Sequence, residues 1–144
     1  MQAPVVFEKM AKPHWRQCVD YLEKLGIIPP NHQILNSENI LDFHTFIKDG
    51  VILCLLANTL DKNSINLNEV VQKPKNSTFL CLKNVQLFLD ACVNHFNLDP
   101  NVLFKPDNLF ECTNFVKVLS TISDLSKSPK ALQSGYKPLP GKTG

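Results

Sequence analysis

The sequence predicts an all-α protein built around a single hydrophobic core. In several segments the apolar residues recur at intervals of three and four, which places them on one face of a helix. No two segments read as strands that could pair, and a lone strand would leave its backbone groups without partners. The 144 residues suit one domain with tails. The 44% hydrophobic content excludes a chain that is disordered throughout.

The first predicted helix covers residues 14–25 and carries Trp15 and Leu22 on its apolar face. Pro13 suits the first turn of a helix, and Gly26 suits the position just after a helix end. The prolines at residues 29–30 forbid a further helical turn, so a loop follows.

Two helices are expected next, in quick succession. Ser37 is suited to cap the first of them. The second begins after Asp49 and Gly50 with the uninterrupted apolar run of residues 51–57. By periodicity alone this run could be a buried strand or a buried helix. The absence of a second strand and the capping ability of Asp49 favour a helix, and a helix that is apolar on all sides belongs at the centre of a bundle.

The remaining sequence predicts a polar loop over residues 61–77, a long amphipathic helix, and a last long helix capped by Asp107 or Asn108. The apolar stripe assigned to the last helix includes Cys112 and Val116. Together the predicted helices point one set of side chains into the core: Trp15, Leu22, Val51, Leu53, Cys54, Leu56, Leu82, Val85, Leu89, Phe115 and Leu119.

The composition changes after Ser126, where Lys, Ser, Pro and Gly dominate. We therefore expect a flexible N-terminal segment over residues 1–12, one helical domain over residues 13–127, and a linker towards a downstream region over residues 128–144.

Several classes of function are not expected from these residues. The four histidines lie in different predicted elements, so no nucleophile, base and orienting group come together as an enzyme requires. The five cysteines are widely spaced in apolar patterns, which predicts reduced thiols and neither disulfides nor a metal site. We expect no cofactor and no metal.

Nucleic acid and membranes are also not expected as partners. Fourteen of the fifteen basic residues are lysines, whereas specific nucleic-acid recognition relies on the arginine fork. No apolar stretch is long enough to span a bilayer, and the N-terminus does not read as a signal peptide. We therefore expect a cytoplasmic protein with no membrane span.

One segment carries a family signature. Residues 48–56 read KDGVILCLL, which resembles the (K/R)DGxxLCxL motif that starts the buried central helix of calponin-homology (CH) domains. The inward Trp15, the Lys-Asn-Val segment at residues 83–85, and the Asn-Leu-Phe and Asn-Phe segments beginning at Asn108 and Asn114 follow in the order of that family. The resemblance covers about residues 15–126 and implies four principal helices plus short connecting helices around a buried central helix.

Further segments are similar to the CH domain that opens the Vav family of Rho guanine nucleotide exchange factors. They are WRQC (residues 15–18), PPNH (29–32), SINLNEV (64–70) and FLCLKN (79–84), whereas Tyr21 stands where that family commonly has Trp. The resemblance implies a non-catalytic regulatory module, and we expect a monomer. In that family the CH domain packs on an acidic segment and on the exchange domain, and it holds the exchange activity in check.

Five lysines are candidate contacts for such an acidic partner, because opposite charge steers and registers an interface. They are Lys73, Lys75, Lys83, Lys105 and Lys117. The simpler reading of each is a solvated surface side chain. The alternative function is an F-actin-binding or cytoskeletal adaptor CH domain, with cytoskeletal or signalling proteins as partners. CH domains that bind actin commonly occur in tandem, and this sequence has one CH unit.

Overall fold

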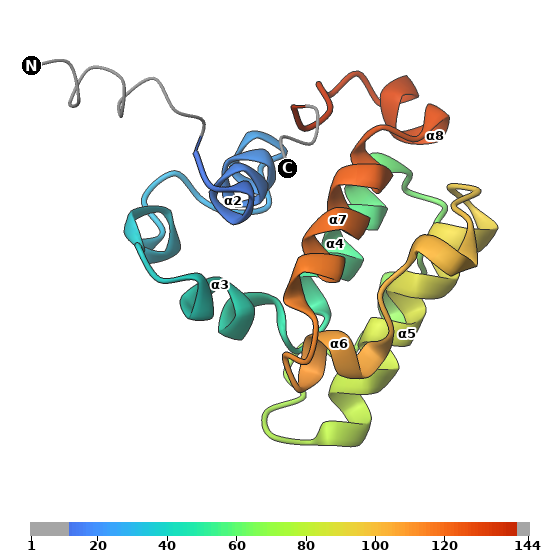
Figure 1. The fold of residues 1–144 in the computed structure, drawn as a ribbon. Helices are drawn as coiled ribbons and strands as arrows, with labels where there is room; N and C mark the ends of the chain where they lie inside the picture. Colours follow the sequence, from blue (N-terminus) through green and yellow to red (C-terminus); the bar gives the residue numbers. More distant parts are fainter. Residues whose placement is uncertain (1–11, 141–144) are drawn as a thin grey trace, which may run out of the picture.

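The computed structural model describes residues 12–140, and over that range all of the regular secondary structure is helical (Figure 1). The all-α prediction is confirmed. The segments 1–11 and 141–144, which hold most of the predicted N-terminal segment and the end of the predicted linker, lie outside the described residues. The α-helices are α2 (His14–Lys24), α3 (Ile40–Ile47), α4 (Val51–Leu60), α5 (Thr78–Asn94), α6 (Pro106–Phe110), α7 (Phe115–Ser126) and α8 (Pro129–Gln133), with short 3-10 helices η1 (Gln33–Asn36), η2 (Leu67–Glu69) and η3 (Pro100–Val102).

The apolar run that could have been a strand or a helix is helix α4. Its side chains Leu53, Cys54 and Leu56 have no exposed surface. α4 packs along α5 and against α3, while α7 contacts α2, α6 and α8. The four longest helices, α2, α4, α5 and α7, are thus the principal ones, and shorter helices connect them. None of the helices between residues 12 and 140 has both the length and the apolar character needed to cross a membrane.

Gly26 ends the first helix, as predicted. Its backbone is left-handed, with φ of 82°, a conformation that glycine adopts without steric penalty. The N–H of Gly26 bonds the carbonyl of Glu23 at 2.9 Å, and the N–H of Ile27 bonds that of Leu22 at 3.0 Å. This pair of bonds is a Schellman motif, which satisfies the last carbonyls of α2.

The start of α3 differs from the prediction. Asn39, and not Ser37, is the N-cap, because its side-chain oxygen accepts a hydrogen bond from the N–H of Leu41 at 2.9 Å. Ser37 lies two residues earlier, where its hydroxyl donates to the carboxylate of Asp42 at 2.7 Å. Both residues can cap a helix, and the sequence alone does not decide between them.

The predicted last long helix is in fact two helices, α6 and α7. Asn114 interrupts it, since its side chain accepts a hydrogen bond from the N–H of Lys117 at 3.2 Å and caps α7. Cys112 falls in the connecting turn with φ of 58° and is exposed. Val116 is 74% exposed. Both had been assigned to the buried stripe, and both assignments are wrong.

The folded part extends past residue 127, where the linker was expected to begin. Ala131 on α8 is 1% exposed and Leu139 is 3% exposed, and both belong to the hydrophobic core. The N–H of Leu139 donates to the hydroxyl of Ser126 at 3.0 Å. Because Pro and Ser dominate this segment, its composition does not indicate that Ala131 and Leu139 are buried.

Candidate interaction surface

The histidines make structural contacts in separate parts of the fold. His44 Nε2 lies 2.7 Å from the carbonyl oxygen of Leu109, and its ring packs edge-on against Phe115 with centroids 5.5 Å apart. His32 caps η1, because its Nδ1 accepts from the N–H of Ile34 at 3.0 Å. Across residues 12–140 no three His, Cys, Asp or Glu side chains gather closely enough to hold a metal ion.

The core thiols are held in their neutral form. Burial raises the pKa of both Cys18 and Cys54 to about 12. Burial also raises the pKa of Cys92, which has no exposed surface. A thiol that does not ionise is a poor nucleophile and a poor metal ligand. These side chains act as small apolar residues, and Cys112 differs from them because it is exposed.

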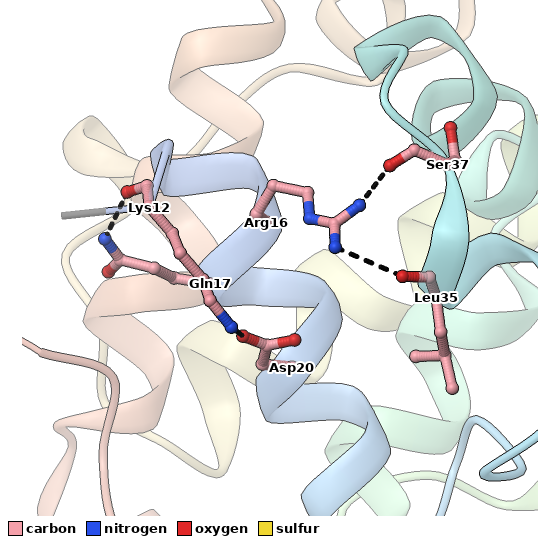
Figure 2. A network of polar contacts seen from close by, with 6 residues as sticks. All are labelled: Lys12, Arg16, Gln17, Asp20, Leu35 and Ser37. Carbon is pink, nitrogen blue, oxygen red and sulfur yellow. Dashed lines mark hydrogen bonds and ion pairs between the residues drawn. The ribbon is translucent and has the colours of Figure 1, made fainter. Parts of the chain in front are cut away.

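Arg16 makes structural contacts within the fold (Figure 2). Its guanidinium donates to the carbonyl of Leu35 at 3.1 Å and to that of Ser37. It also lies over the ring of Trp15, 5.4 Å from the ring centroid. The planar fork of arginine suits this bridge between α2 and the end of η1, where Leu35 lies in η1 and Ser37 follows it.

A second set of contacts in the same view orders the start of α2. The ammonium of Lys12 forms an ion pair with Asp20 at 2.7 Å, and the side-chain amide of Gln17 donates to the backbone carbonyl of Lys12, also at 2.7 Å (Figure 2). Lys12 is therefore tied to α2 by both its backbone and its side chain.

Asn84 fixes the position of three segments. It is fully buried on α5, and its amide nitrogen donates to the carbonyls of Asp49 at 3.0 Å and Val71 at 2.9 Å. Its amide oxygen accepts from the N–H of Val71 at 2.9 Å. A buried amide with its hydrogen-bonding groups satisfied in this way locks the turn before α4 and the loop before α5 onto α5.

Most of the residues expected in the core are buried, and they belong to one cluster. Val51 and Leu82 are partly exposed. Val51 is the first residue of α4. Leu82 lies beside the buried stripe of α5, which runs through Cys81, Val85 and Phe88.

The five candidate lysines occupy four elements at one end of the domain. Lys73 and Lys75 flank the buried Pro74 in the loop before α5, and Lys83 is exposed on α5. Lys105 is the N-cap of α6, and Lys117 is partly buried on α7. α6 contacts both α5 and α7, and Figure 1 shows the starts of α5 and α7 beside α6 at the lower end of the view.

The charge of this lysine surface is mixed. Asp107 on α6 and Glu111 just after it are both exposed, and α6 contacts both α5 and α7. Lys48 lies over the ring of Phe110, 4.8 Å from the centroid, and adds a further cation to the same end. An incoming acidic chain would therefore meet cations and carboxylates in a defined order, which favours one register over others.

Sequence reasoning missed the most exposed of the large hydrophobic side chains in the described part of the chain. Phe79, in the first turn of α5, is 75% exposed. Together with Leu82 and Leu87 it lines a shallow groove of about 370 Å³ between Lys83 and Asp90. Spacing alone places Phe79 on the predicted apolar face, because it lies three residues before Leu82, whereas the buried face of α5 in the structure runs through Cys81, Val85 and Phe88.

Comparison with known proteins places these features in a family. The family described as "Calponin homology (CH) domain" matches residues 30–131. "Guanine nucleotide exchange factor VAV3" of Mus musculus is 42% identical over 127 residues, which cover 88% of this chain and 15% of that protein. "Protein vav" of Drosophila melanogaster is 41% identical over 120 residues, covering 83% of this chain and 15% of that protein. The chain thus spans about 15% of the length of these curated relatives.

A solved structure has the same fold. The structure described as "Autoinhibited Vav1" aligns with a TM-score of 0.85 and 39% identity, covering 89% of this chain and 24% of that one. A second structure, described as Vav1 inhibited by an allosteric inhibitor, aligns with a TM-score of 0.87 and 37% identity, covering 93% of this chain and 24% of that one.

Proposed function

The chain belongs to the calponin-homology family, and from that membership we propose that it is the autoinhibitory CH domain of a Vav-like Rho-family guanine nucleotide exchange factor. The observation that supports this most is its 39% identity and TM-score of 0.85 to the structure described as "Autoinhibited Vav1". In this proposal the chain is a non-catalytic, monomeric regulatory module of the cytoplasm. The exchange activity resides elsewhere in the longer protein.

The domain acts by packing on an acidic segment and on the exchange domain of the same protein. The lysine surface formed by Lys73, Lys75, Lys83, Lys105 and Lys117 is the proposed contact. Complementary charge gives such a contact its orientation and speed more than its strength. The rigid setting supplied by Asn84 keeps the loop before α5 in place for that contact.

Charge reversal in the full-length protein tests the proposal. Lys73→Glu, Lys75→Glu and Lys83→Glu together are expected to raise basal nucleotide exchange on a Rho-family GTPase by about five-fold or more, the low end of a typical allosteric coupling. Lys62→Glu, at an exposed lysine in the turn after α4, is the matched control. Thermal melts of each variant check that the fold is retained.

Deletion of the residues before Gly50 distinguishes a wrong contact surface from a wrong proposal of autoinhibition. It removes α2 and α3, so the domain cannot fold and basal exchange should rise. If the deletion raises exchange and the lysine variant does not, another face makes the contact. If neither raises exchange, autoinhibition by this domain is wrong. Pelleting of the isolated chain with F-actin near physiological salt would then favour the cytoskeletal alternative.

A further inference from the structure

The shallow groove of about 370 Å³ on α5, here called the α5 groove, has the shape of a seat for a second helix. Its lining residues lie at intervals of three and four on one side of α5. They are Phe79, Leu82, Lys83, Gln86, Leu87 and Asp90. They form two successive diamonds of positions i, i+3, i+4 and i+7, the first beginning at Phe79 and the second at Lys83. In helix pairs, each such diamond is the hole that receives one side chain of the facing helix.

The α5 groove is open to solvent. Phe79 is 75% exposed, and the other apolar side chains that line the groove, Leu82 and Leu87, are partly exposed. The three polar side chains of the groove are all exposed. In Figure 1, α5 runs along the right side of the fold. Apolar side chains that gather on a polar surface mark an interaction site, whereas single ones are common on any protein.

The charges of α5 are few and complement each other. Lys83 and Asp90 are the only charged residues of this 17-residue helix, and they lie seven positions apart on the same side. Within residues 12–140 neither of them forms an ion pair. The carboxylate of Asp90 accepts a hydrogen bond at 2.9 Å from the side-chain amide of Gln86 on the same helix. Both charges are therefore open to an opposite charge on a partner.

A second copy of the chain supplies both opposite charges when the two α5 helices run antiparallel. A two-fold axis between residues 86 and 87 places Lys83 opposite the partner's Asp90, and Asp90 opposite the partner's Lys83. The same axis brings Phe79 beside the partner's Val93, a residue that is partly exposed. A parallel, in-register pair would instead place like charges side by side, which is unfavourable. The charges therefore select the antiparallel arrangement.

We propose that the α5 groove is a self-association site, at which two copies of this domain pair through antiparallel α5 helices. Two-fold pairs of this kind are the commonest oligomers. A helix of 17 residues is about 25 Å long, so one helix from each copy gives less than the roughly 800 Å² per partner of a stable dimer. The pair is therefore weak. The domain is a monomer in dilute solution and pairs where copies are concentrated.

The proposal does not depend on the regulatory function proposed above. Lys83 belongs both to the α5 groove and to the lysine surface, so a second copy and an acidic partner would compete for that side chain. Phe79 and Asp90 lie outside the lysine surface. Variants at these two positions therefore test self-association alone.

Sedimentation equilibrium of the whole chain, from about 10 µM to about 1 mM at low salt, measures the association. We expect the average mass to rise from one chain towards two, with a dissociation constant on the order of 0.1–1 mM that weakens as salt is added. Phe79→Ser should weaken the association about ten-fold or more, because it removes the largest apolar contact. Val116→Ser is the matched control at an apolar side chain that is 74% exposed on α7, and it should change the dissociation constant by less than about two-fold.

Charge reversal tests the antiparallel register. Lys83→Asp places two carboxylates opposite each other at both contacts, and Asp90→Lys places two ammonium groups there. Each variant alone should associate about ten-fold more weakly or worse. In a mixed dimer of the two variants, opposite charges face each other again at both contacts, so an equimolar mixture should associate within about three-fold of the unmodified chain. Both side chains are exposed, so the variants should fold.

Three outcomes would overturn the proposal. An average mass that stays at one chain up to about 1 mM would leave the α5 groove to a helix of another protein or to none. A mixture that associates no better than either charge variant alone would contradict the antiparallel register. A larger loss with Val116→Ser than with Phe79→Ser would place the contact on α7. All of these results come from the isolated chain and none bears on basal exchange in the longer protein, so the two proposals fail separately.

Discussion

Contacts in the structure explain the motif at residues 48–56. The carboxylate of Asp49 accepts from the N–H of Val51 at 3.0 Å, which satisfies one of the free N–H groups at the start of α4. Gly50 has φ of 83°, and a Cβ there would lie 2.7 Å from the Cβ of Asn84. The thiol of Cys54 donates to the carbonyl of Asn84 at 3.2 Å. Gly50 and Cys54 therefore set how closely α4 approaches α5, while Asp49 caps the start of α4.

Replacing Gly50 with alanine should test this close approach. The left-handed backbone and the overlap with α5 together should lower the free energy of unfolding by about 2–5 kcal/mol. Gly26→Ala is the matched control, because Gly26 has φ of 82° with nothing within 4 Å of an added Cβ. It should lower the free energy by only about 1 kcal/mol. Urea unfolding followed by circular dichroism measures both, and equal losses would show that the contact with α5 is unimportant.

Some of these residues could be predicted from the sequence and others could not. Asp49 and Gly26 act on their immediate neighbours, so their roles follow from local rules. Gly50 also breaks the helix locally, but its close approach to Asn84 on α5 does not follow from such rules. The role of Asn84 depends on Val71, thirteen positions away in a loop, and no spacing rule predicts that pairing. Cys112 was misplaced because an apolar pattern continued through it, although the chain turns there.

At the level of elements, the split between α6 and α7 and the packing of the C-terminal segment have a common explanation. In both places one interaction outweighs what the composition of the surrounding chain predicts. The side chain of Asn114 caps α7 within an otherwise helical pattern. Leu139 anchors a segment whose prolines and lysines are typical of a linker. The packing of Leu139 depends on its burial against other elements, which the sequence of its own segment does not specify.

Truncation of the chain tests whether the C-terminal segment is part of the domain. A chain ending at Lys127 loses the buried side chain of Leu139 and its hydrogen bond to Ser126. Loss of these interactions should lower the free energy of unfolding by about 2–4 kcal/mol. A chain ending at Pro140 retains both interactions and should match the full chain. Differential scanning calorimetry of the two truncations decides the point, and equal melting temperatures would return the segment to the role of a linker.

For the whole molecule, the fold and the family could be predicted from the sequence, but the surfaces could not. Helical periodicity and the residue 48–56 motif depend on neighbours along one segment. A recess is lined jointly by α2 and residues 135–140, and the lysine surface joins a loop to three helices. Surfaces of this kind are set by how the helices pack, which is why one fold presents different faces to different partners.

The buried acids of the core should make the whole domain sensitive to alkaline pH. Burial raises the pKa of Cys18 and Cys54 from 9.0 to about 12, and that of Tyr21 from 10.0 to about 12. The unfolded chain releases these protons first, so the stability is fully present below about pH 9 and falls as pH rises towards 12. Each buried thiol should contribute a loss of about 1.4 kcal/mol per pH unit in this range.

Urea unfolding from neutral pH to about pH 11 measures the slope of the free energy of unfolding against pH. Cys18→Ala should make the slope shallower, whereas Cys112→Ser, at an exposed thiol, should leave it unchanged. A slope that Cys18→Ala does not alter would place the cause of alkaline unfolding outside the core thiols.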